Sequence, residues 1–264
     1  MALTDSLEGK VVLVTGASRG IGEAFALRFA RAGASVGITA RTEHEGDHRF
    51  AGSLDSTVRQ IRDTGGTACA VAGDLSSSDE RERIVAEISA ELGPIDILVN
   101  NAAITYFAPV DNFDLNRWQL MFDVQVLGPF HLAQLVLPQM RSTGAGWILN
   151  ISSPAALHPV GPPYFSGGGT VYGMCKAALE RFSTGLAAEL YDDNIAVNSL
   201  APTGLVVTPG VKHHQLDQRI PVERHEDVSV IAEAAFLLCS RSPHELTGRI
   251  AFSQKLLAEF NVTP

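Results

Sequence analysis

A tyrosine and a lysine stand four residues apart in the segment from Tyr172 to Lys176 (YGMCK). If this segment is helical, both side chains lie on one face with Cβ atoms about 5–6 Å apart. A free tyrosine has a pKa of about 10, so it is a poor acid–base catalyst at neutral pH, and an adjacent ammonium group would stabilise the phenolate. Such a pair also occurs by chance on protein surfaces, so its meaning depends on the rest of the chain.

A glycine-rich turn spans Thr15–Gly22 (TGASRGIG), after the β-branched run Val11–Val14 and before apolar residues at helical spacing. Gly16 permits a tight turn, Gly20 lets the backbone approach a phosphate, and Gly22 lets helix and strand pack closely. The N-terminus of the helix offers free N–H groups to an anion. A strand before and a helix after are the context that a dinucleotide-binding turn requires, although a glycine turn alone is weak evidence.

Two arginines bear on the choice of cofactor. An acidic residue at the end of the second strand would bind the ribose 2′-hydroxyl of NAD, whereas arginine accommodates a 2′-phosphate. The second expected strand, Ser35–Thr39, is followed by Ala40-Arg41, and Arg19 lies in the glycine turn. These residues favour NADP(H) over NAD(H). The alternative is that Arg41 is a solvated loop residue.

Short apolar runs alternate with amphipathic segments along the whole chain. The expected strands are Val11–Val14, Ser35–Thr39, Ala68–Ala72, Ile95–Val99, Gly146–Ile151 and Ile195–Leu200. The expected helices are Ile21–Ala32, a segment ending at Asp63, Ser78–Leu92, Leu115–Met140 and Val171–Tyr191. This order predicts an α/β fold, a single-domain Rossmann-type doubly wound parallel sheet with helices on both faces. Two segments, Thr42–Ser56 and the Gly/Pro-rich Leu157–Thr170, are expected to be loops.

Composition narrows the class of protein. The 264 residues are 45% hydrophobic, carry a formal net charge of −9 and include only three cysteines, at Cys69, Cys175 and Cys239. That excludes a disulfide framework and favours a reducing, cytoplasmic compartment. No basic stripe, signal peptide or long apolar run is visible, so we expect neither nucleic-acid nor membrane partners, and no metal site.

Taken together, the motifs resemble those of the short-chain dehydrogenase/reductase family, and the match spans nearly the whole chain. The residues that carry the resemblance are Thr15–Gly22, Asp74 in GDL, Asn100 to Ala103 (NNAA), Asn150 to Ser153 (NISS), Tyr172–Lys176, and Asn198 to Pro202. The resemblance implies a nicotinamide-dependent oxidoreductase that interconverts an alcohol and a ketone or aldehyde by hydride transfer.

The resemblance also implies a role for each matching residue. Ser153 would hydrogen-bond the substrate oxygen, Tyr172 would be the general acid or base, and Lys176 would hold the nicotinamide ribose and depress the pKa of Tyr172. Asp74 would touch the adenine, and Val206 would meet the nicotinamide carboxamide through its backbone. The expected cofactor-binding residues are Gly16, Ser18, Arg19, Gly20, Ile21, Gly22, Arg41, Asp74, Leu75, Asn101, Ala102, Ala103, Tyr172, Lys176, Pro202, Gly204, Val206 and Thr208.

The chain departs from the family pattern at four places. Gln125 stands where the family has an asparagine that holds a proton-relaying water, so Gln125 is a candidate participant. Ser153 and Tyr172 are 19 residues apart (172 − 153), more than is usual, and the surplus lies in Leu157–Thr170. The turn Pro202-Thr203-Gly204 is one residue longer, and the usual D-G-G near the C-terminus is absent, which weakens the expectation of a homotetramer or dimer.

The leading hypothesis is an NADP(H)-dependent oxidoreductase with a largely apolar substrate, with segments 157–170 and 206–228 shaping the pocket. An acyl-carrier ketoreductase is disfavoured because an acidic protein repels an acidic carrier. The alternatives are a dinucleotide-binding sensor or structural subunit with little catalysis, which Gln125 motivates, and an epimerase or dehydratase on a nucleotide sugar. His213 and His214 are expected to be solvated loop residues.

Overall fold

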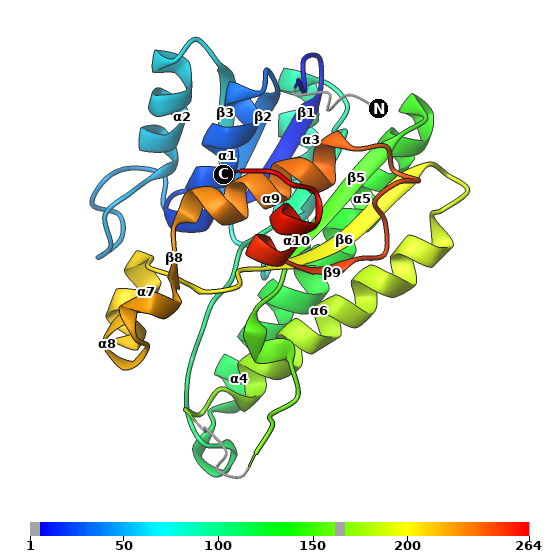
Figure 1. Ribbon diagram of the computed structural model, residues 1–264. Coiled ribbons are helices and arrows are strands. Elements are labelled where there is room, and N and C mark those ends of the chain that lie inside the picture. The colour runs from blue at the N-terminus through cyan, green and yellow to red at the C-terminus, as the bar shows by residue number, and fades with distance from the viewer. Residues whose placement is uncertain (1–5, 162–166, 264) are drawn as a thin grey trace.

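A seven-stranded, entirely parallel sheet forms the centre of the molecule, a computed structural model that describes residues 6–161 and 167–263. The strand order is β3-β2-β1-β4-β5-β6-β9 (Figure 1). The strands are β1 (Val11–Thr15), β2 (Ser35–Ala40), β3 (Thr67–Ala72), β4 (Ile97–Asn100), β5 (Gly146–Ile151), β6 (Ile195–Ala201) and β9 (Ile250–Phe252), and β7 (Leu205–Val206) pairs separately with β8 (His225–Glu226). The order reverses between β1 and β4, where ligands of such sheets bind beyond the carboxyl ends of the strands.

Helices cover both faces of the sheet, as the sequence predicts. The α-helices are α1 (Gly20–Arg31), α2 (Leu54–Asp63), α3 (Ser78–Leu92), α4 (Leu115–Phe122), α5 (Gly128–Thr143), α6 (Thr170–Glu189), α7 (Pro209–His213), α8 (Leu216–Arg219), α9 (Val228–Ser240) and α10 (Ser253–Glu259). Short helical turns are η1 (Val110–Asn112), η3 (Pro154–Ala156) and η4 (Val222–Arg224), and η2 (Asp123–Leu127) is a π-helix.

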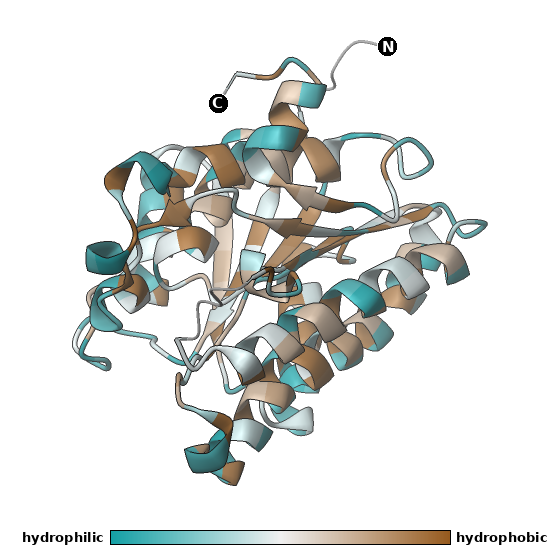
Figure 2. Cartoon of the chain, turned by 60° about the horizontal axis from the view of Figure 1, so that its bottom comes forward, coloured by the Kyte–Doolittle hydropathy of each residue, from teal (hydrophilic) through white to brown (hydrophobic). Residues whose placement is uncertain are grey.

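Alternation along β1 shows how the two layers form. Val12 and Val14 belong to the core that contains α1, α2, α9 and α10, whereas Val11 and Leu13 belong to the core that contains α3, α5 and α6. Because successive strand residues point to opposite faces, each strand is apolar on both sides. In Figure 2 the hydrophobic colour lies along the strands between the helix layers, and hydrophilic colour lies on the outer turns of the helices.

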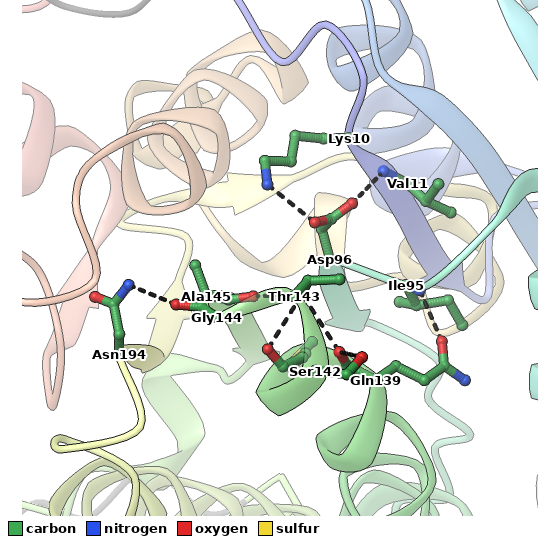
Figure 3. A network of polar contacts seen from close by, with 11 residues as sticks. Lys10, Val11, Ile95, Asp96, Gln139, Ser142, Thr143, Gly144, Ala145 and Asn194 are labelled. Atoms are coloured by element: carbon green, nitrogen blue, oxygen red, sulfur yellow. Dashed lines mark hydrogen bonds and ion pairs between the residues drawn. The ribbon is translucent and has the colours of Figure 1, made fainter.

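A polar network fixes the amino edge of the sheet, opposite the edge where the strands end (Figure 3). The buried Asp96 carboxylate accepts from Lys10 Nζ and from Val11 N, both at 2.9 Å. Gln139 of α5 accepts from Ile95 N at 2.8 Å, which ties the helix to the segment before β4. This edge is therefore held by side chains, and the loops at the carboxyl edge remain available for binding.

The structure corrects three boundaries. The expected helix Leu115–Met140 runs on to Thr143, and η2 interrupts it in the middle. The expected loop Thr42–Ser56 ends earlier, because Ser53 and Ser56 form a capping box that begins α2 at Leu54. Segment 206–228, which is expected to shape the pocket, contains two short helices, α7 and α8, that the sequence analysis does not predict.

The stretch Leu115–Thr143 is also long and apolar enough to cross a membrane, with a mean hydropathy of 1.4 in its most apolar window. Length and composition alone are weak evidence for a membrane span, because the core helix of a folded domain passes the same test. Leu132, Val136 and Met140 of this stretch pack in the core beneath the sheet, and 39% of the window is buried. One side of the helix therefore packs against the sheet, while more than half of the window is not buried.

Candidate active site

Ser153, Tyr172 and Lys176 come together at the carboxyl edge of the sheet. Ser153 follows β5 and caps η3, while Tyr172 and Lys176 occupy successive turns of α6, on the same face as their spacing predicts. The hydroxyl groups of Ser153 and Tyr172 are hydrogen-bonded. Lys176 Nζ lies 5.6 Å from the centroid of the Tyr172 ring and donates to the carbonyl of Ile151 at 2.8 Å.

Burial controls the ionisation of this pair. It lowers the pKa of Lys176 from 10.5 to about 8, because the ammonium is removed from water. It raises the pKa of Tyr172 above 10.0, and the hydrogen bond with Ser153 offsets only part of that rise. The resemblance implies a depressed tyrosine pKa, and the direction here is opposite because desolvation of the phenol outweighs the stabilisation of the phenolate.

Gln125 lies at the centre of the π-helix η2 and is 1% exposed. Its Nε2 donates to the carbonyl of Ile104 at 2.9 Å, and its Oε1 is buried with no hydrogen-bond partner among the described residues. A buried amide oxygen without a partner is unfavourable unless a water or ligand completes it. The π-turn was missed from the sequence, because one extra residue in a turn leaves the helical periodicity almost unchanged.

A chain of buried polar groups links β4, β5 and α6. Asn100 Nδ2 donates to Asn150 Oδ1 at 2.8 Å, and Asn150 Nδ2 donates to Ser183 Oγ at 2.9 Å. Ser152 turns away from the site, since its hydroxyl donates to Glu180 Oε1 at 2.6 Å. This geometry leaves Ser153, and not Ser152, beside the tyrosine.

The glycine turn is as compact as its sequence predicts. A Cβ on Gly22 would lie 2.3 Å from the carbonyl oxygen of Gly16, and a Cβ on Gly16 would lie 2.8 Å from Ala102 Cα. Gly20 has a φ of +64°, and a Cβ there would lie 3.2 Å from the methyl group of Thr208. The N-cap residue of α1, Arg19, makes no side-chain cap, so the N–H groups of the first turn are open to an anion.

Asn101 is used to hold this turn. Its Nδ2 donates to the carbonyl oxygens of Thr15 and Gly16 at 2.9 and 3.2 Å. The backbone N–H groups of Asn101 and Ala102 both donate to Thr15 Oγ1 at 3.0 Å. The expected cofactor segment Asn101 to Ala103 therefore lies against the glycine turn, with the Asn101 side chain facing the backbone.

The two arginines differ in their surroundings. Residues Thr42–Ser53 form a long connection after β2, which we call the strap. Arg19 donates to three strap carbonyls, those of Ala51 at 3.0 Å, Phe50 at 3.3 Å and Gly52 at 2.6 Å. Arg41 is exposed at the end of β2, with no hydrogen bond or ion pair to the described residues. Arg41 is therefore the freer of the two cations.

Asp74 and Leu75 lie beside Arg41, because Gly73 N donates to the Ala40 carbonyl at 3.0 Å across neighbouring strands. The Asp74 carboxylate accepts from the backbone and hydroxyl of Ser76, both at 2.9 Å. Leu75 is buried. These residues form the wall where the resemblance places the adenine.

A buried carboxylate holds the turn after β6. Glu226 accepts from the backbone N–H groups of Thr203 and Gly204 at 3.1 and 3.2 Å and from Ser253 Oγ at 2.6 Å. The turn is thus fixed directly before Val206, which stands in β7. This support was missed from the sequence, because its three parts are distant in the chain and none belongs to a motif.

Aromatic rings pack next to Tyr172. The Phe107 ring meets Tyr172 edge-on at 6.1 Å and His214 edge-on at 5.0 Å. His214 Nε2 lies 3.2 Å from Thr105 Oγ1, and burial, together with the neighbouring His213, lowers the pKa of His214. The expectation of solvated loop histidines is wrong for His214, which packs in the site. Residues 162–166 of the segment Leu157–Thr170, which include Tyr164, lie outside the described residues.

Comparisons with known proteins identify a family of enzymes whose members resemble this chain in sequence and in fold. The family model for short chain dehydrogenases matches residues 10–219. The chain is 34% identical over 251 residues to 7alpha-hydroxysteroid dehydrogenase of Escherichia coli K12, covering 92% of each protein. It superimposes on a putative dehydrogenase from Xanthomonas campestris with a TM-score of 0.86 at 30% identity, covering 98% of this chain and 92% of that one. It also superimposes on L-sorbose reductase from Gluconobacter frateurii, complexed with NADPH and L-sorbose, with a TM-score of 0.81 at 29% identity, covering 94% and 96%.

Proposed function

Because the chain belongs to the short-chain dehydrogenase family, we propose that it is an NADP(H)-preferring oxidoreductase that interconverts an alcohol and a ketone or aldehyde. The observation that carries this proposal is the meeting of Ser153, Tyr172 and Lys176 at the edge where the glycine turn also lies. An acid–base group beside a dinucleotide cradle is what hydride chemistry at a carbonyl carbon requires.

The residues present fit a nicotinamide dinucleotide. The packed glycines leave room for a pyrophosphate at the open N-terminus of α1, and Lys176 presents an ammonium group to a ribose beside Tyr172. When bound, the nicotinamide ring supplies or accepts the hydride.

The side chains would then handle the substrate oxygen and its proton. Ser153 donates a hydrogen bond to that oxygen. Tyr172 protonates it during reduction and removes its proton during oxidation.

The raised pKa of Tyr172 suits the direction of reduction, since the phenol holds its proton at neutral pH. Lys176, with a pKa of about 8, exchanges a proton more readily than an ordinary lysine. A water on the unpartnered Oε1 of Gln125 would extend the proton path, in the place where the family uses an asparagine.

The preference for NADP(H) rests on Arg41. Its exposed guanidinium follows β2, where the 2′-substituent of the adenosine ribose would lie, and no acid occupies the strand end. Several solved relatives contain this form of the cofactor, among them L-sorbose reductase with NADPH.

A largely apolar substrate is favoured by the ring of Phe107 beside Tyr172 and by the buried Val206 of β7. The segments 157–170 and 206–228 would form the walls of the pocket. Among relatives, the Escherichia coli protein at 34% identity is a hydroxysteroid dehydrogenase, which is consistent with an alicyclic substrate.

We further propose a cytoplasmic homo-oligomer. Leu127 in η2, Phe130 in α5 and Met174 in α6 expose 46%, 44% and 46% of their surfaces. Phe130 also contacts Phe182 of α6, so the apolar surface spans two helices. A second copy covering this surface would shield it from water.

The test is cofactor turnover across a panel of ketones and aldehydes with NADPH and with NADH, followed by the near-ultraviolet absorbance of the reduced nicotinamide. The control is Tyr172→Phe, in which binding of NADPH is measured separately by calorimetry. We expect NADPH-preferring turnover that disappears in Tyr172→Phe while NADPH binding persists. Turnover equal in both proteins would refute the role of Tyr172. NADPH binding without turnover on any substrate would favour the sensor or structural alternative.

A further inference from the structure

The strap joins the glycine turn to the helix after β7. Arg19 binds the carbonyls of strap residues 50–52, as described above. Directly before them in the chain, Arg49 Nη2 lies 2.9 Å from His213 Nε2, and the rings of Phe50 and His213 are 5.4 Å apart. In Figure 1 this loop, between β2 and α2, lies beside α7. None of its residues belongs to the motifs that carry the family resemblance.

An open cleft of about 470 Å³ separates the strap from α7. Arg49, Phe50, Thr208, Lys212 and His213 are among the residues that line it. Thr208 is also the residue whose methyl group faces Gly20 at the glycine turn. Thr208 therefore lies between this cleft and the glycine turn, so the cleft is next to the N-terminus of α1, where an anion would bind.

The acidic residues of the strap and Arg49 differ in the groups they contact. Its three acidic residues all contact groups of the strap itself: Glu43 lies 4.0 Å from His44 Nε2, Glu45 accepts from Gly52 N at 3.3 Å, and Asp47 accepts from His44 N at 2.7 Å. Arg49, by contrast, pairs with an imidazole nitrogen and lies 4.8 Å from the ring of Phe50. A phosphate oxygen is a stronger acceptor for guanidinium than a neutral imidazole is. The contact with His213 is therefore one that an incoming phosphate can replace.

We propose that Arg49 is a cofactor-binding residue, which leaves His213 and binds the pyrophosphate of the dinucleotide from the side opposite α1. Arg19 holds the strap backbone next to Arg49, so the Arg49 side chain would reach the phosphate while residues 50–52 stay in place. This inference rests on the proposed function, because it requires a dinucleotide at the glycine turn.

The test measures binding of ADP and of adenosine by calorimetry at low salt, since the two probes differ only in the pyrophosphate group. Arg49→Gln removes the charge, Arg49→Lys keeps it, and Arg59→Gln is a matched control at an exposed arginine of α2. We expect Arg49→Gln to weaken ADP binding about tenfold, as for loss of one charge-assisted hydrogen bond. Adenosine binding should be unchanged, Arg49→Lys should recover part of the loss, and Arg59→Gln should bind as the wild type does.

His213→Ala provides a second arm, because it removes the group that competes for Arg49. Its affinity for ADP should equal or exceed that of the wild type. A loss as large as that in Arg49→Gln would mean that the contact between strap and α7 matters, and not the charge, which overturns the proposal. Unchanged ADP binding in Arg49→Gln would also overturn the proposed role of Arg49. If the wild-type protein binds ADP and NADPH in that case, the proposed function still stands. A wild-type protein that binds neither ADP nor NADPH would refute both the role of Arg49 and the proposed function.

Discussion

Lys176 is 3% exposed, and its burial lowers its pKa from 10.5 to about 8. The folded protein therefore binds this proton more weakly than the unfolded chain does, so the charged lysine destabilises the fold. Each tenfold change in proton affinity is worth about 1.4 kcal/mol. The destabilisation is fully present below pH 8, amounts to about 3 kcal/mol at pH 7, and fades as the pH rises toward 10.5. At pH 9.5 about 1.4 kcal/mol remains.

Lys176→Met replaces the ammonium by an apolar group of similar length. The variant also loses the hydrogen bond to the Ile151 carbonyl, worth about 1 kcal/mol. We therefore expect it to be more stable than the wild type by about 2 kcal/mol at pH 7 and equally stable near pH 9.5. It should be inactive, because the ammonium next to Tyr172 is gone.

The assay is urea denaturation of both proteins at several pH values between 6.5 and 9.5, a range below the pKa of Tyr172. Other titrating groups are shared, so the difference in unfolding free energy isolates Lys176. Lys255→Met, at an exposed lysine, should show a difference near zero at every pH. A difference for Lys176→Met that stays constant with pH would refute the assignment of a buried lysine with a lowered pKa.

Three further changes test other parts of the molecule. Asp96→Ala leaves Val11 N without its acceptor and should lower the free energy of unfolding by about 1–3 kcal/mol in urea, whereas Ser142→Ala at the exposed end of α5 should change it by less than about 0.5 kcal/mol. Phe130→Glu places a charge on the apolar surface of α5 and should convert an oligomer to a monomer in light scattering; an unchanged mass would assign the interface elsewhere. Gln125→Leu should lower kcat with little effect on the KM for NADPH, and Gln125→Asn should keep kcat; equal kcat in all three proteins would exclude a relay through this amide.

The sequence predicts the parallel sheet and the placement of Tyr172 and Lys176 because these depend on local pattern. β-Branched runs mark the strands, the glycines mark the turn, and a spacing of four residues on α6 determines one shared face. The family resemblance adds Ser153, which the fold brings within hydrogen-bonding distance of Tyr172. Features of this kind can be predicted because they depend on residues that are close together in the sequence.

Other features depend on contacts that no local pattern encodes. Arg19 binds backbone carbonyls of the strap, and every residue has a carbonyl, so its partners leave no trace in the sequence. Glu226 and Ser253 meet only because β8 and α10 converge on the turn after β6. The pKa of Tyr172 likewise reflects the burial of the whole site, which no local pattern encodes.

The fastening of the strap by Arg19 limits how the cofactor preference of this protein could be redesigned. An engineer seeking an NADH-dependent variant would first replace the arginines nearest the expected 2′-phosphate. Replacing Arg19 would release three carbonyls and detach the strap from the glycine turn, so affinity for either cofactor would fall. The Arg41 side chain makes no comparable hydrogen bonds to the described residues. Directed libraries for cofactor exchange should therefore vary position 41 and its neighbours while keeping position 19 fixed.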